Sequence, residues 1–256
     1  MKTLQQRVEY VKTKGQKAFV PYVMAGDGDL KKQLLHLQQK GATAIEVGIP
    51  FSDPVADGPI IQEAGQRALQ NGANLTNILH ELATLQQTIT TPIVIMTYFN
   101  PIVHYGIEKF VQAASAANVK GLIIPDLPIE EADCIQPFLK ETDIALVQLI
   151  SLTSPIERIK KLSQAAEGFI YAVTVNGITG TQKPSESSLH DHFATLQQIA
   201  TIPVLAGFGI STKEHVQQMN QYVDGVIVGS AIVQAFHDND ETIIDELFSA
   251  NQLSIH

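Results

Sequence analysis

The chain has 256 residues, 45% of them hydrophobic, so it is long enough to bury a large core. Its formal net charge of −9, with basic residues scattered rather than clustered, argues against a nucleic-acid-binding surface. No stretch approaches the ~18 apolar residues of a membrane span, the N-terminus lacks the apolar segment of a signal peptide, and the single cysteine, Cys134, excludes an internal disulfide. We therefore expect a soluble, cytoplasmic protein with no nucleic-acid partner and no membrane segment.

Short apolar, β-branched runs alternate along the chain with longer amphipathic stretches. The opening segment, residues 2–13, is predicted to be an extra helix that closes the bottom of a barrel. Most of the apolar runs carry apolar residues on both faces, as parallel strands buried beneath helices do. The eight predicted strands are 18–26, 44–50, 92–100, 121–126, 144–151, 169–176, 203–209 and 225–231. Amphipathic helices are predicted between strands, for example over 29–41, 76–88, 107–118 and 154–166.

Eight strands alternating with helices predict an α/β fold of the (β/α)8 TIM-barrel type. A doubly wound open sheet is the structural alternative. No shift in composition and no low-complexity linker marks a boundary, so a single domain is expected over residues 1–256. The glycine-bearing stretch 176–190 follows the sixth strand, on the face where barrels carry their chemistry. Both a mobile lid and an ordinary surface loop fit its polar composition.

Glu46 interrupts a predicted strand that is otherwise apolar, residues 44–50. Burying an ionised carboxylate is costly, and burial normally raises the pKa of such a group toward neutrality. A raised pKa suits a residue that must give and take protons near pH 7. A structural Glu, paired with a Lys or Arg or accepting backbone N–H groups, is the alternative. Position alone does not decide between these two interpretations.

Asp57 lies eleven residues further on, in a loop bounded by prolines at 50, 54 and 59. The prolines stiffen this loop, so it could return a carboxylate to the mouth of the barrel at little entropic cost. An Asp-Gly turn that only bonds its own backbone is the alternative. We assign the neighbouring Asp53 to the hydrogen bonding of the loop itself.

Glycines gather after each of the last three predicted strands: Gly177, Gly180, Gly207, Gly209 and Gly229, the last followed by Ser230. Glycine lets backbone N–H groups approach an anion closely, and a helix beginning after Ser230 would point its positive end at the same place. Barrels often bind phosphate with the loops after strands seven and eight. This pattern favours a phosphate site, with ordinary turn glycines as the alternative.

Metal and nucleotide sites are not expected. His190-Asp191-His192 is the one dense cluster of metal-ligand residue types in the sequence, and we interpret it as a solvated helix start. The glycines at 26 and 28 do not form a dinucleotide-binding fingerprint, and no Walker-type loop occurs.

Five segments resemble the tryptophan synthase alpha subunit family: FVPYVMAGD, IEVGIPFSDPVADGPIIQ, GITG, LAGFGIS and VIVGSAIV. They follow in the family's order and spacing from about residue 15 to residue 235, and the pattern E-x-G-x-PFSDPxADGP is highly specific. The resemblance implies a (β/α)8 barrel that cleaves indole-3-glycerol phosphate to indole and glyceraldehyde 3-phosphate by a retro-aldol reaction. It further implies an α2β2 complex, in which indole passes to a beta subunit that carries pyridoxal phosphate, and no cofactor in this chain.

The resemblance also carries roles to particular positions. It implies that Glu46 is the general acid/base and that Asp57 is a second catalytic carboxylate. Phosphate binding maps to the backbone at Gly180, Gly209, Gly229 and Ser230. The candidates for the indole pocket are Tyr22, Ile61, Met96, Ile123 and Tyr171, and Thr179 is expected to couple closure of the lid to Asp57. Val175 departs from the family, because this lid position is basic in some members; the departure would weaken lid contacts and leave the chemistry untouched.

Three other functions are weighed against this one. A catalytically weak partner that mainly activates a beta subunit is disfavoured, because both carboxylates are in place. A different phosphosugar enzyme, such as an isomerase or the synthase that forms indole-3-glycerol phosphate, is disfavoured because no predicted strand ends in a lysine. A free-standing indole-3-glycerol-phosphate lyase is the closest alternative, since it would keep the same site residues.

Overall fold

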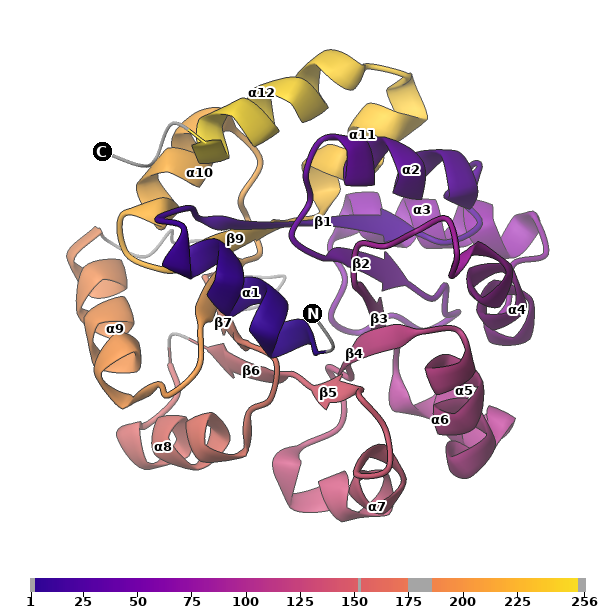
Figure 1. The fold of residues 1–256 in the computed structure, drawn as a ribbon, viewed down its shortest axis with the longest axis horizontal. Coiled ribbons are helices and arrows are strands. Elements are labelled where there is room, and N and C mark those ends of the chain that lie inside the picture. Colours follow the sequence, from indigo (N-terminus) through magenta and orange to yellow (C-terminus); the bar gives the residue numbers. More distant parts are fainter. Residues whose placement is uncertain (1–2, 152, 175–185, 253–256) are drawn as a thin grey trace.

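A ring of parallel strands surrounded by helices makes up the protein (Figure 1). The computed structural model describes residues 3–151, 153–174 and 186–252. The strands are β1 (Ala18–Met24), β2 (Ile45–Gly48), β3 (Ile93–Met96), β4 (Val119–Ile123), β5 (Ala145–Leu146), β6 (Gln148–Ser151), β7 (Ile170–Val173), β8 (Val204–Gly207) and β9 (Gly225–Val228). The helices are α1 (Leu4–Thr13), α2 (Leu30–Gln39), α3 (Pro59–Gln70), α4 (Leu75–Leu85), α5 (Phe99–Tyr105), α6 (Ile107–Ala116), the 3-10 helix η1 (Ile129–Cys134), α7 (Gln136–Leu139), α8 (Ile156–Ala165), α9 (Glu186–Ile199), α10 (Lys213–Asn220), α11 (Ser230–Asp238) and α12 (Glu241–Gln252).

The predicted strand 144–151 joins the two ends of the sheet. The strand order is β5-β4-β3-β2-β1-β9-β8-β7-β6, and β5 and β6 are separated in the chain only by Val147. β5 pairs with β4 and β6 pairs with β7, so one short stretch of chain meets both neighbours. The N–H of Val147 donates to the carbonyl of Leu122 at 3.0 Å. The TIM barrel is thereby confirmed, and the open sheet is excluded.

Successive residues of a strand face different layers, which explains why the strands are apolar throughout. In β1, Ala18 and Val20 belong to the cluster inside the ring, whereas Phe19 and Val23 belong to the larger cluster that the outer helices share. All seven residues of β1 are buried. A strand that is buried on both faces therefore shows no alternation of polar and apolar residues in the sequence.

Helix α1 closes one end of the ring, as predicted for residues 2–13; in Figure 1 it crosses in front of the strands. Leu4 and Val8 are fully buried in the interior cluster. A Cβ atom at Gly121 would lie only 2.7 Å from Leu4 Cδ2, so Leu4 fits between the strands only because this position is a glycine. A capping box between Thr3 and Gln6 begins the helix.

Several strands end earlier than predicted, and two of these errors concern the site most directly. The strand expected over 92–100 stops at Met96, because α5 begins at Phe99, whose N–H donates to Asp126 Oδ1 at 2.9 Å. The strand expected over 225–231 stops at Val228, because α11 begins at Ser230. Both helices start directly at the carboxyl edge of the barrel.

Among the described residues, no helix is long and apolar enough to cross a membrane.

Candidate active site

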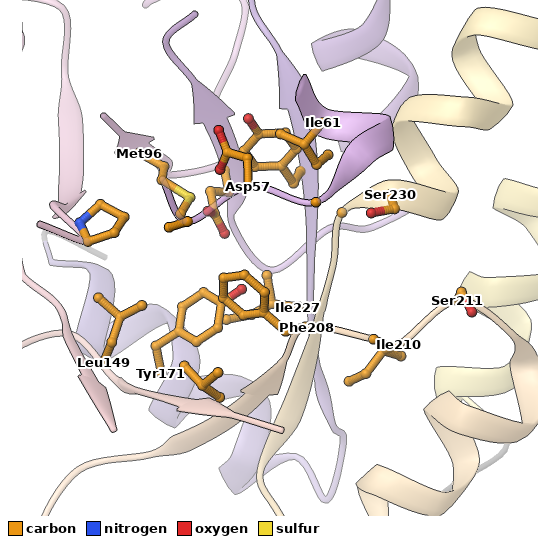
Figure 2. Close-up of a pocket in the computed structure, with 18 of the residues that line it drawn as sticks. Asp57, Ile61, Met96, Leu149, Tyr171, Phe208, Ile210, Ser211, Ile227 and Ser230 are labelled. Atoms are coloured by element: carbon orange, nitrogen blue, oxygen red, sulfur yellow. The ribbon is translucent and has the colours of Figure 1, made fainter. Parts of the chain in front are cut away.

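A cavity of about 710 Å³ lies at the carboxyl ends of the strands, opposite the end that α1 closes. In the view of Figure 2, Asp57, Ile61 and Met96 lie on one side of this cavity. Leu149, Tyr171 and Phe208 lie across from them, and Ile210, Ser211 and Ser230 occupy a third side. None of the described lining residues is Lys, Arg or His. The cavity thus combines apolar walls with two carboxylates and a few hydroxyl groups.

Glu46 is a buried carboxyl group with no countercharge among the residues that the structure describes. It lies on β2 beside Tyr22 of β1 and Val94 of β3, and its exposure is 1%. Its Oε2 atom has no hydrogen-bond partner, and no Lys or Arg pairs with it, within the described part of the chain. Burial, and then the nearby charge of Asp57, raise the pKa of Glu46 to about 8. Glu46 therefore holds a proton at neutral pH and can transfer it.

Asp57 is held in place by partners on both sides of it. The Tyr98 hydroxyl accepts the N–H of Ala56 at 2.9 Å. Burial raises the pKa of Asp57, and a hydrogen bond from the same hydroxyl to the carboxylate opposes this shift without cancelling it. Gln62 Nε2 donates to the Asp57 carbonyl at 2.7 Å. The loop therefore presents its carboxylate in a defined position rather than as a free turn.

Sequence reasoning placed Tyr98 at a strand end but gave it no role. Its ring is buried and packs against Phe51, with ring centroids 5.2 Å apart. The available signal was a polar aromatic residue near the predicted carboxyl end of a barrel strand. Nothing in the sequence indicates that its hydroxyl meets a loop that lies 42 residues earlier.

Two tyrosine rings reach the cavity by crossing a glycine of the adjacent strand. A Cβ atom at Gly48 would lie 1.8 Å from the Tyr22 hydroxyl oxygen. One at Gly207 would lie 2.5 Å from the Tyr171 hydroxyl oxygen. The Tyr171 ring also packs against Phe208, with centroids 5.6 Å apart (Figure 2). Any larger residue at either glycine would displace a ring that forms the wall.

The structure brings most of the predicted indole-pocket residues together. Tyr22, Ile61, Met96 and Tyr171 all line the cavity. Ile123 does not line it, because its side chain is fully buried in the cluster inside the ring. Thr179 lies outside the described residues. Further apolar lining residues that the sequence analysis did not single out are Leu149, Phe208, Ile210 and Ile227. Leu149 and Ile227 face inward from β6 and β9, so strand alternation was the signal that could have found them.

One end of the cavity is suited to an anion. Gly209, Gly229 and Ser230 line it together with Ser211. Helix α11 begins at Ser230, so its first N–H groups and its positive dipole end lie at this side. Because the described lining has no Lys, Arg or His, an anion here would be held by backbone N–H groups and hydroxyls. Gly180, the remaining predicted phosphate residue, lies outside the described residues.

The His190-Asp191-His192 segment belongs to α9, and none of its three residues lines the cavity. His190 Nδ1 lies 3.2 Å from Asp191 Oδ1, and the His190 ring packs edge-on against Tyr222. Across the residues that the structure describes, no three His, Cys, Asp or Glu side chains are grouped as metal ligands would be.

Comparison with known proteins places this chain in a family. The family model described as "Tryptophan synthase alpha chain" matches residues 8–254. The tryptophan synthase alpha chain of Listeria welshimeri is 53% identical over 241 residues, covering 93% of this chain and 92% of the relative. That of Streptococcus pneumoniae is 50% identical over 244 residues, covering 93% and 94%.

Solved structures agree with the sequence comparison. The tryptophan synthase alpha subunit of Legionella pneumophila superposes with a TM-score of 0.86 at 33% identity, covering 100% of this chain and 98% of that one. A chain of the tryptophan synthase of Mycobacterium tuberculosis superposes with a TM-score of 0.88 at 30% identity, covering 97% and 98%. The chain belongs to the tryptophan synthase alpha chain family.

Proposed function

We propose that this chain is a lyase that cleaves indole-3-glycerol phosphate to indole and glyceraldehyde 3-phosphate. The observation that carries the proposal is Glu46, a buried proton donor that pairs with no Lys or Arg of the described residues and lines a cavity beside a second carboxylate, Asp57. The apolar walls suit a flat indole ring, and the end formed by Gly209, Gly229 and Ser230 suits a phosphate group. Membership of the family supports the same substrate.

Glu46 would perform both proton transfers. The bond between indole C3 and the glycerol chain breaks only after C3 gains a proton and the adjacent hydroxyl loses one. Glu46, with a pKa of about 8, gives its proton to C3 and becomes a carboxylate. That carboxylate then takes the hydroxyl proton. The O–H electrons form the aldehyde C=O, and the electrons of the broken C–C bond return to the indole ring.

Asp57 would stabilise the intermediate stage. Protonation of C3 leaves a positive charge on the pyrrole ring, centred on its N–H. An ionised Asp57 can accept this N–H as a hydrogen bond and offset the charge inside the cavity. Tyr98 and Gln62 hold Asp57 and its loop in place, so little reorganisation is needed when the charge develops. In this scheme Thr179 couples closure of the lid to Asp57, as the family resemblance implies.

We further infer that the chain works with a beta subunit that receives the indole, in an α2β2 assembly. The similarity to a chain of the Mycobacterium tuberculosis tryptophan synthase supports such a partner. We expect pyridoxal phosphate in that beta subunit rather than in this chain, which would act through its own side chains.

Indole release from indole-3-glycerol phosphate, by the purified chain alone and with a beta subunit added, tests the proposal. Slow release alone with strong activation by the partner is the expected result. Fast release alone would favour a free-standing lyase. No release under either condition, with a phosphate ligand still bound, would overturn the roles of Glu46 and Asp57 and leave a binding partner.

A further inference from the structure

Thr174 is a buried hydroxyl residue that the reaction steps do not use. It follows β7 directly, and its N–H donates to the carbonyl of Gly207 at 3.0 Å. Its hydroxyl lies 2.9 Å from the same carbonyl oxygen and also within hydrogen-bond distance of the carbonyl of Phe208, so its single proton is shared between the two in a bifurcated hydrogen bond. One side chain therefore holds two consecutive carbonyl groups of the segment that follows β8.

Phe208 needs such a restraint, because its backbone has a φ of +67°, in the left-handed region. For a bulky residue this conformation is strained, so the surrounding contacts must impose it. The Phe208 ring packs against Tyr171 in the cavity wall (Figure 2). The restrained segment is thus part of the site.

The geometry of the peptide unit carries this restraint to the next residue. The carbonyl of Phe208 and the N–H of Gly209 belong to one planar trans peptide, so they point in opposite directions. Because the Thr174 hydroxyl holds the Phe208 oxygen, the Gly209 N–H must point away from Thr174. This N–H has no acceptor among the described residues, and Gly209 lines the anion end of the cavity with Gly229 and Ser230.

We propose that Thr174 is a positioning residue for the anion end: its hydroxyl fixes the peptide between Phe208 and Gly209 so that the Gly209 N–H faces the substrate phosphate. This role rests on the proposed function, which supplies the phosphate. Without the hydroxyl, the Phe208 oxygen loses its donor, and the peptide can rotate and turn the amide away from the anion.

Three variants of the full chain separate this role from general packing. Thr174→Val keeps the shape and removes the hydroxyl, Thr174→Cys leaves only a weak S–H donor, and Thr174→Ser keeps the hydroxyl. Calorimetry measures the binding of indole-3-propanol phosphate and of phosphate-free indole-3-propanol. Thr174→Val should weaken the phosphate ligand about tenfold, which corresponds to the loss of one hydrogen bond to a charged group, and the phosphate-free ligand less than about twofold.

The other variants set the scale of the effect. Thr174→Ser should stay within about twofold of the wild type for both ligands, and Thr174→Cys should fall between Ser and Val for the phosphate ligand. If Thr174→Val binds indole-3-propanol phosphate as tightly as the wild type, the positioning role of Thr174 is refuted. If the Val variant does not fold, wild-type affinity in Thr174→Cys refutes it instead. An equal loss of both ligands would also refute it, because it would show only a structural contribution. A wild-type chain that binds neither ligand would instead overturn the proposed function, and the Thr174 role with it.

Discussion

Replacing Glu46 with Gln should abolish indole release and, at the same time, stabilise the fold. Gln is nearly isosteric with Glu and cannot ionise. In the folded wild type, burial raises the pKa of Glu46 from 4.5 to about 8. Between these two values the unfolded chain gives up this proton and the folded chain keeps it, so the wild-type fold loses stability as the pH rises. The Gln variant does not bear this cost.

The size of the effect follows from the two pKa values. Each unit of difference corresponds to about 1.4 kcal/mol, so the pH-dependent part of the Gln variant's advantage is about 1 kcal/mol at pH 5 and about 3 kcal/mol at pH 7. It should level off near about 5 kcal/mol above pH 8, where Glu46 is ionised in both states. The hydrogen bonds of the Gln amide can add a constant to the stability difference between the two proteins, but this constant does not vary with pH. A gain in stability with a loss of activity is typical of a buried catalytic group.

Urea unfolding of both proteins from pH 5 to pH 9 measures this advantage, with far-UV circular dichroism as the probe because the chain has no tryptophan. Glu246→Gln, on the exposed face of α12, is the matched control for replacing one carboxylate with an amide. If the stability advantage of Glu46→Gln does not change over this pH range, burial does not raise the pKa of Glu46. Glu46 would then not hold its proton at neutral pH as proposed. An active Gln variant would remove Glu46 from the mechanism.

Three further changes test the rest of the site and the fold. Asp57→Asn should lower the turnover rate by about 100-fold or more, because the charge opposite the indole N–H is lost. It should also move the alkaline limit of the residual rate to lower pH, because the Asp57 charge helps to raise the pKa of Glu46. Indole release measured over a pH series checks the rate and its alkaline limit. A near-normal rate would contradict the catalytic role of Asp57. Tyr98→Phe removes the donor to Asp57 and the acceptor of the Ala56 N–H, and should lower kcat about tenfold in the same assay; an unchanged kcat would show that the loop does not depend on Tyr98. Leu4→Ala should cost about 2–5 kcal/mol of unfolding free energy, measured with urea, with KM unchanged, and an unaltered stability would mean that α1 does not complete the core.

The barrel could be predicted because buried parallel strands are apolar on both faces and so stand out from amphipathic helices. Strand ends were less accurate. Tyr98 and Ser230 continue apolar runs in the sequence, yet both lie where helices begin. Residues 144–151 divide into β5 and β6 because β5 pairs with β4 and β6 pairs with β7. The local sequence pattern does not indicate this division, because it depends on two different neighbouring strands.

The sequence by itself determined which residues could do the chemistry: Glu46 within an apolar strand, Asp57 between prolines, and glycines at the ends of the last strands. Only the tertiary structure decided that Glu46 Oε2 has no hydrogen-bond partner among the described residues, and that Ile123 lies beneath the cavity rather than in its wall. It also decided that Tyr98 holds the Asp57 loop across 42 residues and that Thr174 holds the carbonyl of Gly207 across 33. Periodicity and turn chemistry act over a few neighbouring residues, whereas burial, pKa and hydrogen-bond partners depend on strands that meet only when the barrel closes.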